Sequence, residues 1–221
     1  MSVNINASTT NGLVLTSDTS GELKLQANGA DIATVSSTGI AMAAGKTLPA
    51  ASLTGTLPAG TNVISAGTSV ASTSGTSIDF TSIPSWVKRI VVMFNGVSTA
   101  GSGTNLEIRI GSGSVQTSGY LASCAANTNN ATTYVAAYTS GYAFTGQSGV
   151  NDIHNGHLIL TLVDSSTYKW VGTGLDNLSN NTRMLITAGS VTLGGVLDRV
   201  RVTTTNGTDT FDAGSINILY E

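Results

Sequence analysis

The sequence predicts an all-β protein, with an extended N-terminal β-hairpin and attachment segment followed by a jelly-roll-like β-sandwich. Gly, Ser, Thr and Asn together make up 103 of the 221 residues, a composition that favours turns and strands over helices. Short runs rich in Val, Ile and Thr recur between clusters of turn residues, which is typical of strands. No stretch carries convincing signals of a helix.

The composition also excludes several classes of protein. Charged residues make up 10% of the chain, against roughly 25% in ordinary soluble domains. Nine Lys and Arg residues spread over the whole length form no basic stripe, so we expect no nucleic-acid partner. No apolar run reaches the about 20 residues of a membrane span, so we expect no membrane insertion. A single cysteine, Cys124, and no secretory signal predict synthesis in a reducing cytoplasm.

Residues 1–66 are predicted to be an attachment and oligomerisation segment. Short apolar bursts recur about every ten residues, at 13–15, 23–25, 32–35 and 40–42. Asn28-Gly29 between two of them predicts a type I′ hairpin turn that sets Leu25 opposite Ile32. The segment has no aromatic residue and can hardly bury a core of its own. We therefore expect it to pair with other chains or to lie on a larger body.

A near-repeat closes this first part of the chain. Thr-Leu-Pro-Ala occurs at residues 47–50 and again at 56–59. Because proline fixes φ and favours an extended predecessor, this stretch is predicted to be extended. Two interpretations stay open: a flexible linker, and a segment that is ordered only by other chains.

Residues 67–221 are predicted to form the sandwich domain. In 106–110 and 199–202 apolar residues alternate with charged ones, so each run has one apolar and one charged face. Eight to ten short strands at this spacing indicate two packed sheets. The candidate strands are 77–83, 87–97, 106–110, 115–124, 134–144, 157–163, 168–172, 184–193, 196–203 and 215–220.

Signals of enzyme or metal chemistry are weak, and we expect no enzyme, no cofactor and no metal site. His154 and His157 are separated by Asn-Gly, which predicts a turn in a solvated loop rather than two zinc ligands. The acids near the last strands, Asp198, Asp209 and Asp212, lack the spacing of a calcium loop. Cys124 lies among small residues and is interpreted as buried.

The most informative stretch is 111–151, which contains no charged residue but four of the six tyrosines. Tyrosine rings among Asn, Ser and Thr suit a sugar ligand, because the rings stack on C–H faces and the polar groups meet hydroxyls. Tyr134, Tyr138 and Tyr142 are therefore candidate ligand-binding residues. The alternatives are core, cross-strand or subunit-interface tyrosines. Trp86 and Trp170 are predicted to be core residues.

Two runs carry a resemblance to a known class of proteins. Residues 77–90 (SIDFTSIPSWVKRI), continued by MFNGVS at 93–98, resemble a C-terminal module of bacteriophage tail-fibre and related virion proteins. The runs GELKLQ at 21–26, ATVSSTGI at 33–40 and AASLTGTLPA at 50–59 are similar in style to phage fibres. The resemblance implies a non-enzymatic virion component, usually trimeric, with a β-rich tip.

On this basis we expect a structural protein of a phage virion, assembled in the host cytoplasm. The first hypothesis is a homotrimeric tail fibre, held on other virion proteins through residues 1–66, whose sandwich contacts a host-surface glycan or protein. Because several copies of the sandwich would contact the host surface at once, each single site can bind weakly and the fibre still adsorbs. The second hypothesis is a capsid decoration or head-fibre protein, docked on capsid subunits through the same segment.

Overall fold

The computed structural model describes residues 22–47 and 64–221, apart from residues 102, 129–132, 147, 148, 151 and 181. The chain divides into two compact units, Met1–Leu57 and Pro58–Glu221. Within the described ranges every regular element is a β-strand, which confirms the predicted all-β class. No helix in these ranges is long and apolar enough to cross a membrane.

In its described part, the first unit is a three-stranded antiparallel sheet made of β1 (Leu23–Ala27), β2 (Ala30–Ser36) and β3 (Gly39–Met42). Asn28 and Gly29 join the first two strands with φ angles of 53° and 75°, as a type I′ turn requires. The predicted pairing of Leu25 with Ile32 is wrong by one residue, because a bulge after Leu25 pairs it with Ala33. Of the near-repeat, only Thr47 lies within the described residues.

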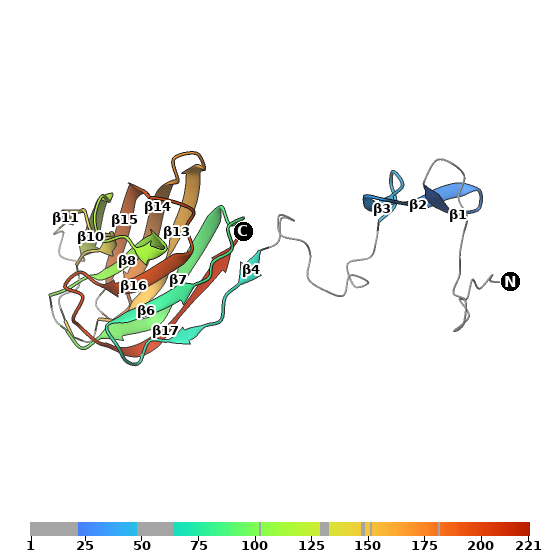
Figure 1. Ribbon diagram of the computed structural model, residues 1–221. Coiled ribbons are helices and arrows are strands. Elements are labelled where there is room, and N and C mark those ends of the chain that lie inside the picture. Colours follow the sequence, from blue (N-terminus) through green and yellow to red (C-terminus); the bar gives the residue numbers. More distant parts are fainter. Residues whose placement is uncertain are drawn as a thin grey trace. The chain divides into compact units, whose positions relative to one another are not determined.

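The second unit is a β-sandwich of two sheets (Figure 1). The nine-stranded sheet has the order β11-β10-β15-β14-β13-β7-β17-β4, and β5 also pairs with β17. Its strands are β4 (Ser65–Ala66), β5 (Val70–Ala71), β7 (Arg89–Thr99), β10 (Leu121–Thr128), β11 (Thr133–Tyr138), β13 (His154–Asp164), β14 (Lys169–Leu178), β15 (Arg183–Thr192) and β17 (Phe211–Tyr220).

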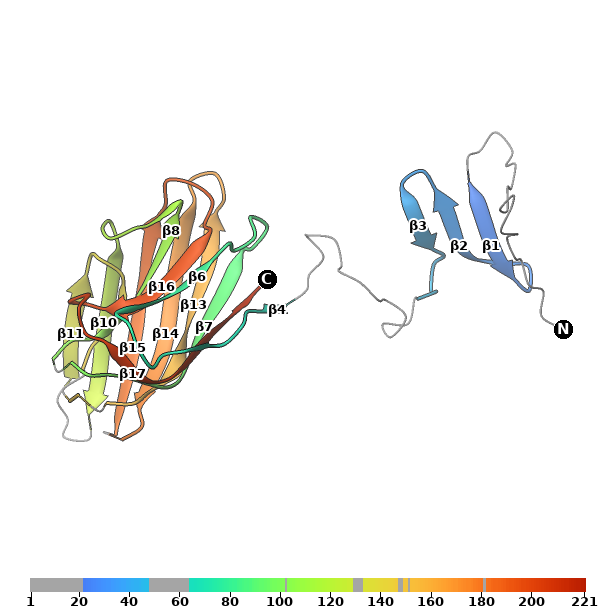
Figure 2. The same ribbon diagram turned by 60° about the horizontal axis from the view of Figure 1, so that its bottom comes forward.

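The five-stranded sheet has the order β12-β8-β16-β6, and β9 pairs with β8. Its strands are β6 (Ser77–Thr81), β8 (Leu106–Ser112), β9 (Ser114–Val115), β12 (Tyr142–Phe144) and β16 (Arg199–Thr204). Figure 2 shows these strands as a second layer against β13, β14 and β15.

Side chains from both inner faces interdigitate in one core. Ile108 and Val200 of the smaller sheet and Val92 and Leu158 of the larger sheet are all fully buried members of it. This is the period-2 pattern of strands that are covered on one face. The alternation predicted for 106–110 and 199–202 is confirmed, because their apolar residues are buried in this core.

Two glycines on the inner face of β14 make room for aromatic rings of the opposite sheet. A Cβ on Gly172 would lie 2.7 Å from Cε1 of Tyr142, and a Cβ on Gly174 would lie 2.6 Å from Cζ of Phe144. Any side chain at these positions would overlap a ring. The strand thus approaches the aromatic residues more closely than another sequence would allow.

Some predicted strand boundaries are wrong. The predicted strand 134–144 is two strands, β11 and β12, which belong to different sheets, so residues 139–141 carry the chain between the layers. The predicted strand 115–124 likewise divides into β9 and β10. Strand β4 pairs with β17, so the sandwich sheet starts at Ser65, before the predicted boundary at residue 67.

Candidate functional site

The structure does not bring the three predicted ligand-binding tyrosines together on one surface. Tyr142 is 0% exposed and packs edge-on against Tyr120 at 5.4 Å, so its predicted ligand contact is corrected to a core role. Tyr138 is half-buried, and its hydroxyl accepts a hydrogen bond of 2.9 Å from Asn105. Tyr134 lies in β11, and its side chain is outside the described part of the structure.

The predicted turn between the two histidines is wrong, because residues 154–157 belong to strand β13. Gly156 permits close pairing there: a Cβ would lie 2.3 Å from the carbonyl oxygen of Leu175. His154 points into the core, where its Nδ1 lies 2.5 Å from Oδ2 of the equally buried Asp176. His157 is half-buried. Among the described residues, no group of three or more His, Cys, Asp or Glu side chains could hold a metal ion.

The acids near the last strands bind neighbouring groups of the protein. Asp198 pairs with Arg199 at 2.7 Å, and this contact lowers the pKa of its carboxyl. Asp212 accepts a hydrogen bond from Ser98, and Asp209 accepts one from Thr104. Each of these carboxylates is therefore bound by a neighbouring group of the protein.

Two core predictions are confirmed. Cys124 is 3% exposed, and burial raises the pKa of its thiol, so it is not an exposed nucleophile. Trp170 is 2% exposed within the core. Trp86 is half-buried and packs against Tyr220, with the ring centroids 5.8 Å apart.

The three-stranded sheet of the first unit has one apolar face. Strand pairing places six residues in two rows on it: Leu23, Val35 and Ile40 in one row, and Leu25, Ala33 and Met42 in the other. Exposed fractions are 40% for Leu23, 46% for Leu25 and 66% for Ile40. Ala33 is the one buried hydrophobic residue in the described part of this unit. A sheet this small needs a cover on its apolar face to be stable in water.

The two outer faces of the sandwich differ in charge. On the smaller sheet, Arg201 forms a bidentate pair with Asp79, both distances being 2.7 Å. Beside it, Arg109 pairs with the fully buried Glu107. Ion pairs therefore cover this face.

The outer face of the nine-stranded sheet is nearly free of charge. One row across it, read from the strand registers, runs from Val135 through Ala125, Ile186, Leu175 and His157 to Met93. Val135 is 74% exposed, Leu175 51% and Ile186 42%. Lys169, its register partner Asp164 and Arg89 are charged residues of this face, and all three lie at one end of the sheet. This row is apolar apart from His157, whereas neighbouring rows of the face also carry Ser, Thr and Asn.

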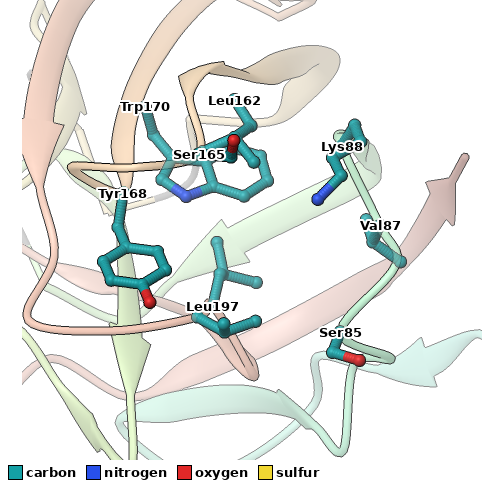
Figure 3. Close-up of a pocket in the computed structure, with 9 residues that line it drawn as sticks. Ser85, Val87, Lys88, Leu162, Ser165, Tyr168, Trp170 and Leu197 are labelled. Atoms are coloured by element: carbon teal, nitrogen blue, oxygen red, sulfur yellow. The ribbon is translucent and has the colours of Figure 1, made fainter.

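A pocket of about 250 Å³ lies at the end of the sandwich where three distant segments meet (Figure 3). They are the segment before β7, the β13–β14 hairpin and the segment before β16. The lining residues are Ser85, Val87, Lys88, Leu162, Ser165, Tyr168, Trp170, Val196 and Leu197.

Backbone contacts hold the walls of this pocket. The amide of Leu162 donates to the carbonyl of Lys88 at 2.8 Å, which joins the hairpin to the start of β7. Within the hairpin, the Asp164 carboxylate accepts bonds from the Ser166 backbone and the Thr167 hydroxyl, at 2.8 and 2.7 Å. Bonds from the Ser166 and Thr167 side chains lower the pKa of Asp164 to about 2. Tyr168 then takes a left-handed φ of 55° before β14 begins.

Of the polar side chains of the pocket, Lys88 and Trp170 can only donate hydrogen bonds, whereas Ser85, Ser165 and Tyr168 carry hydroxyls that donate and accept. Figure 3 shows the Lys88 amine directed toward the centre of the pocket, and the Trp170 indole nitrogen on the side of Tyr168 and Leu197. Nε1 of Trp170 is buried and has no hydrogen-bond partner in the described structure. No carboxylate lines the pocket.

Sequence reasoning identified Trp170 as a core residue but missed the pocket. Lys88, Ser165 and Trp170 come from separate segments, and nothing in the local sequence indicates that these segments meet. The sequence predicted that the first unit can hardly bury a core of its own, and in its described part Ala33 is the one buried hydrophobic residue. Comparisons with family models, with curated proteins and with solved structures find no match to this chain.

Proposed function

We propose that this chain is a structural, non-enzymatic component of a bacteriophage virion, most simply a homotrimeric tail fibre protein. Residues 1–66 assemble the trimer and attach it to other virion proteins, and the sandwich contacts the host surface. The observation that carries the proposal is the apolar face of the three-stranded sheet, on which Leu23, Leu25 and Ile40 are exposed in the described part of the unit.

Self-association would remove that face from water. The six residues in the two rows are apolar. Burying one large apolar side chain contributes about 1.5–3 kcal/mol to the free energy of association. Three copies around an axis bury the same face three times, with no need for complementary charge.

The test is the mass of the full chain in solution, measured by light scattering. We expect three times the mass of one chain, and the mass of one chain for a protein that starts at Pro58. Ile40→Lys is expected to give monomers, because it places a charge on the apolar face. Ala41→Lys is the matched control: Ala41 is exposed and adjacent in β3, but its side chain points to the other face, so the trimer should persist.

Other results would point elsewhere. A trimer that survives both Ile40→Lys and the truncation, and dissociates with Leu175→Lys, would place assembly on the sandwich and overturn the role given to residues 1–66. A monomeric full chain would overturn the trimer. It would favour the capsid decoration protein, in which the same apolar face docks on capsid subunits.

A further inference from the structure

We propose that the pocket lined by Lys88, Ser165, Tyr168 and Trp170 binds a single sugar unit that carries a carboxylate. Neither Tyr138 nor Tyr142 lines this pocket. The inference goes beyond the proposed role in assembly and does not depend on it.

The charge of the pocket favours an anion. Lys88 is exposed and forms no ion pair within the described structure. The carboxylates nearest along the lining segments are engaged elsewhere: Asp164 in its own turn, Asp198 with Arg199, and Glu221 with Arg89. Since no acidic residue lines the pocket, the Lys88 amine is available to a ligand carboxylate.

Further donors converge on the same space. The indole N–H of Trp170 can only donate, and it is buried without a partner. No hydrogen bond holds the hydroxyls of Ser85 and Ser165 among the described residues. The indole N–H has almost no accessible surface, so a ligand in the pocket would meet the ring of Trp170 and the two serine hydroxyls. A polyhydroxylated ligand has oxygens and hydroxyls that can bond to those serines.

The walls and the size of the pocket fit one pyranose ring. Val87, Leu162, Val196 and Leu197 form apolar walls, which suit the C–H faces of a sugar. Tyr168 is half-buried, and its ring adds an aromatic surface. The volume of about 250 Å³ corresponds to on the order of eight water molecules. That space suits a monosaccharide and is too small for a long oligosaccharide.

The test is a titration of the full chain with D-glucuronate and D-glucose, which differ at one carboxylate. Saturation-transfer NMR and tryptophan fluorescence report binding. We expect glucuronate to bind with a Kd of about 1 mM, a weak single site that several copies would reinforce. Glucose is expected to bind at least tenfold more weakly. Lys88→Gln should lower the affinity for glucuronate at least tenfold and leave that for glucose nearly unchanged.

Lys169→Gln is the matched control. Lys169 is an exposed lysine next to Trp170 in β14, and strand alternation directs its side chain to the opposite face of the sheet. It should leave the binding of glucuronate unchanged. Ser165→Ala removes a hydroxyl without a change of charge and should weaken both sugars. Unfolding midpoints check that each variant is folded.

Four results would overturn the inference. The first three are no binding of glucuronate, equal binding of both sugars, and equal binding by the wild type and Lys88→Gln. The fourth is competition by sodium sulfate at the same concentration, which would mean that the pocket holds an adventitious ion only. Light scattering on the same samples separates the two proposals. If the protein is a trimer and does not bind glucuronate, only the inference about the pocket is wrong. If it is a monomer and binds glucuronate, only the proposed assembly is wrong.

Discussion

At the scale of single residues, Tyr120 satisfies the backbone of a neighbouring strand from inside the core. Its hydroxyl accepts a hydrogen bond of 2.8 Å from the amide of Ile110 and donates to the Ile110 carbonyl at 3.2 Å. Burial raises the pKa of this phenol above its usual value, so the hydroxyl keeps its proton. Polar groups in a core need such partners, since water cannot reach them.

Tyr120→Phe is expected to lower the free energy of unfolding by about 1–3 kcal/mol, because it leaves the buried Ile110 amide without its partner. Urea denaturation measures the change. Tyr220→Phe is the control, since the Tyr220 hydroxyl has no hydrogen bond among the described residues. Its effect should stay within about 0.5 kcal/mol. Equal effects of the two variants would show that the Ile110 bond contributes nothing.

At the scale of elements, two glycines of β14 leave room for two aromatic rings of β12. Phe144 occupies the space that a side chain at Gly174 would fill, and it also packs edge-on against Phe94 with centroids 5.9 Å apart. In the same way, the Tyr142 ring occupies the space that a side chain at Gly172 would fill. The glycines therefore set how closely the two layers approach at this point of the core.

We expect Gly174→Ala to destabilise the sandwich by about 1–3 kcal/mol, because the new methyl group overlaps the Phe144 ring. Thermal or urea unfolding measures this loss. Gly194→Ala is the control: no atom lies within 4 Å of a Cβ at Gly194, so the change should be neutral or slightly stabilising. Adding Phe144→Leu to Gly174→Ala should recover part of the loss. A loss that does not depend on Phe144 would contradict this account.

At the scale of the whole molecule, charge is segregated rather than spread. The outer face of the smaller sheet carries ion pairs, whereas on the nine-stranded sheet the outer row from Val135 to Met93 has no Asp, Glu, Lys or Arg and is mostly apolar. The first unit adds an apolar face around Ile40. Exposed apolar areas of this kind mark surfaces for association.

Because these faces carry few charges, we expect self-association to be insensitive to salt. The mass from light scattering should be the same in about 0.05 M and 1 M sodium chloride, a range over which the screening length falls severalfold. Dissociation at high salt would instead mean that ion pairs hold the copies together, and would contradict an apolar interface.

Local features of the fold were predictable from the sequence. The Asn28-Gly29 turn and the alternation in 106–110 depend on neighbouring residues alone, and both were predicted correctly. The register after Leu25 was not, because a bulge depends on how the whole pair of strands fits. His154 was placed in a loop, because an Asn-Gly pair usually turns, yet the strands on both sides pair with it.

By itself the sequence determined the all-β class, the low charge and the buried places of Cys124 and Trp170. Backbone period and turn chemistry are local properties, and they act on every chain in the same way. Only the tertiary structure decided that Tyr142 lies in the core and that Lys88 and Trp170 share a pocket. The burial of a side chain and its distance from other side chains depend on partner strands far along the chain. No single segment of the sequence determines the order of those strands in the sheets.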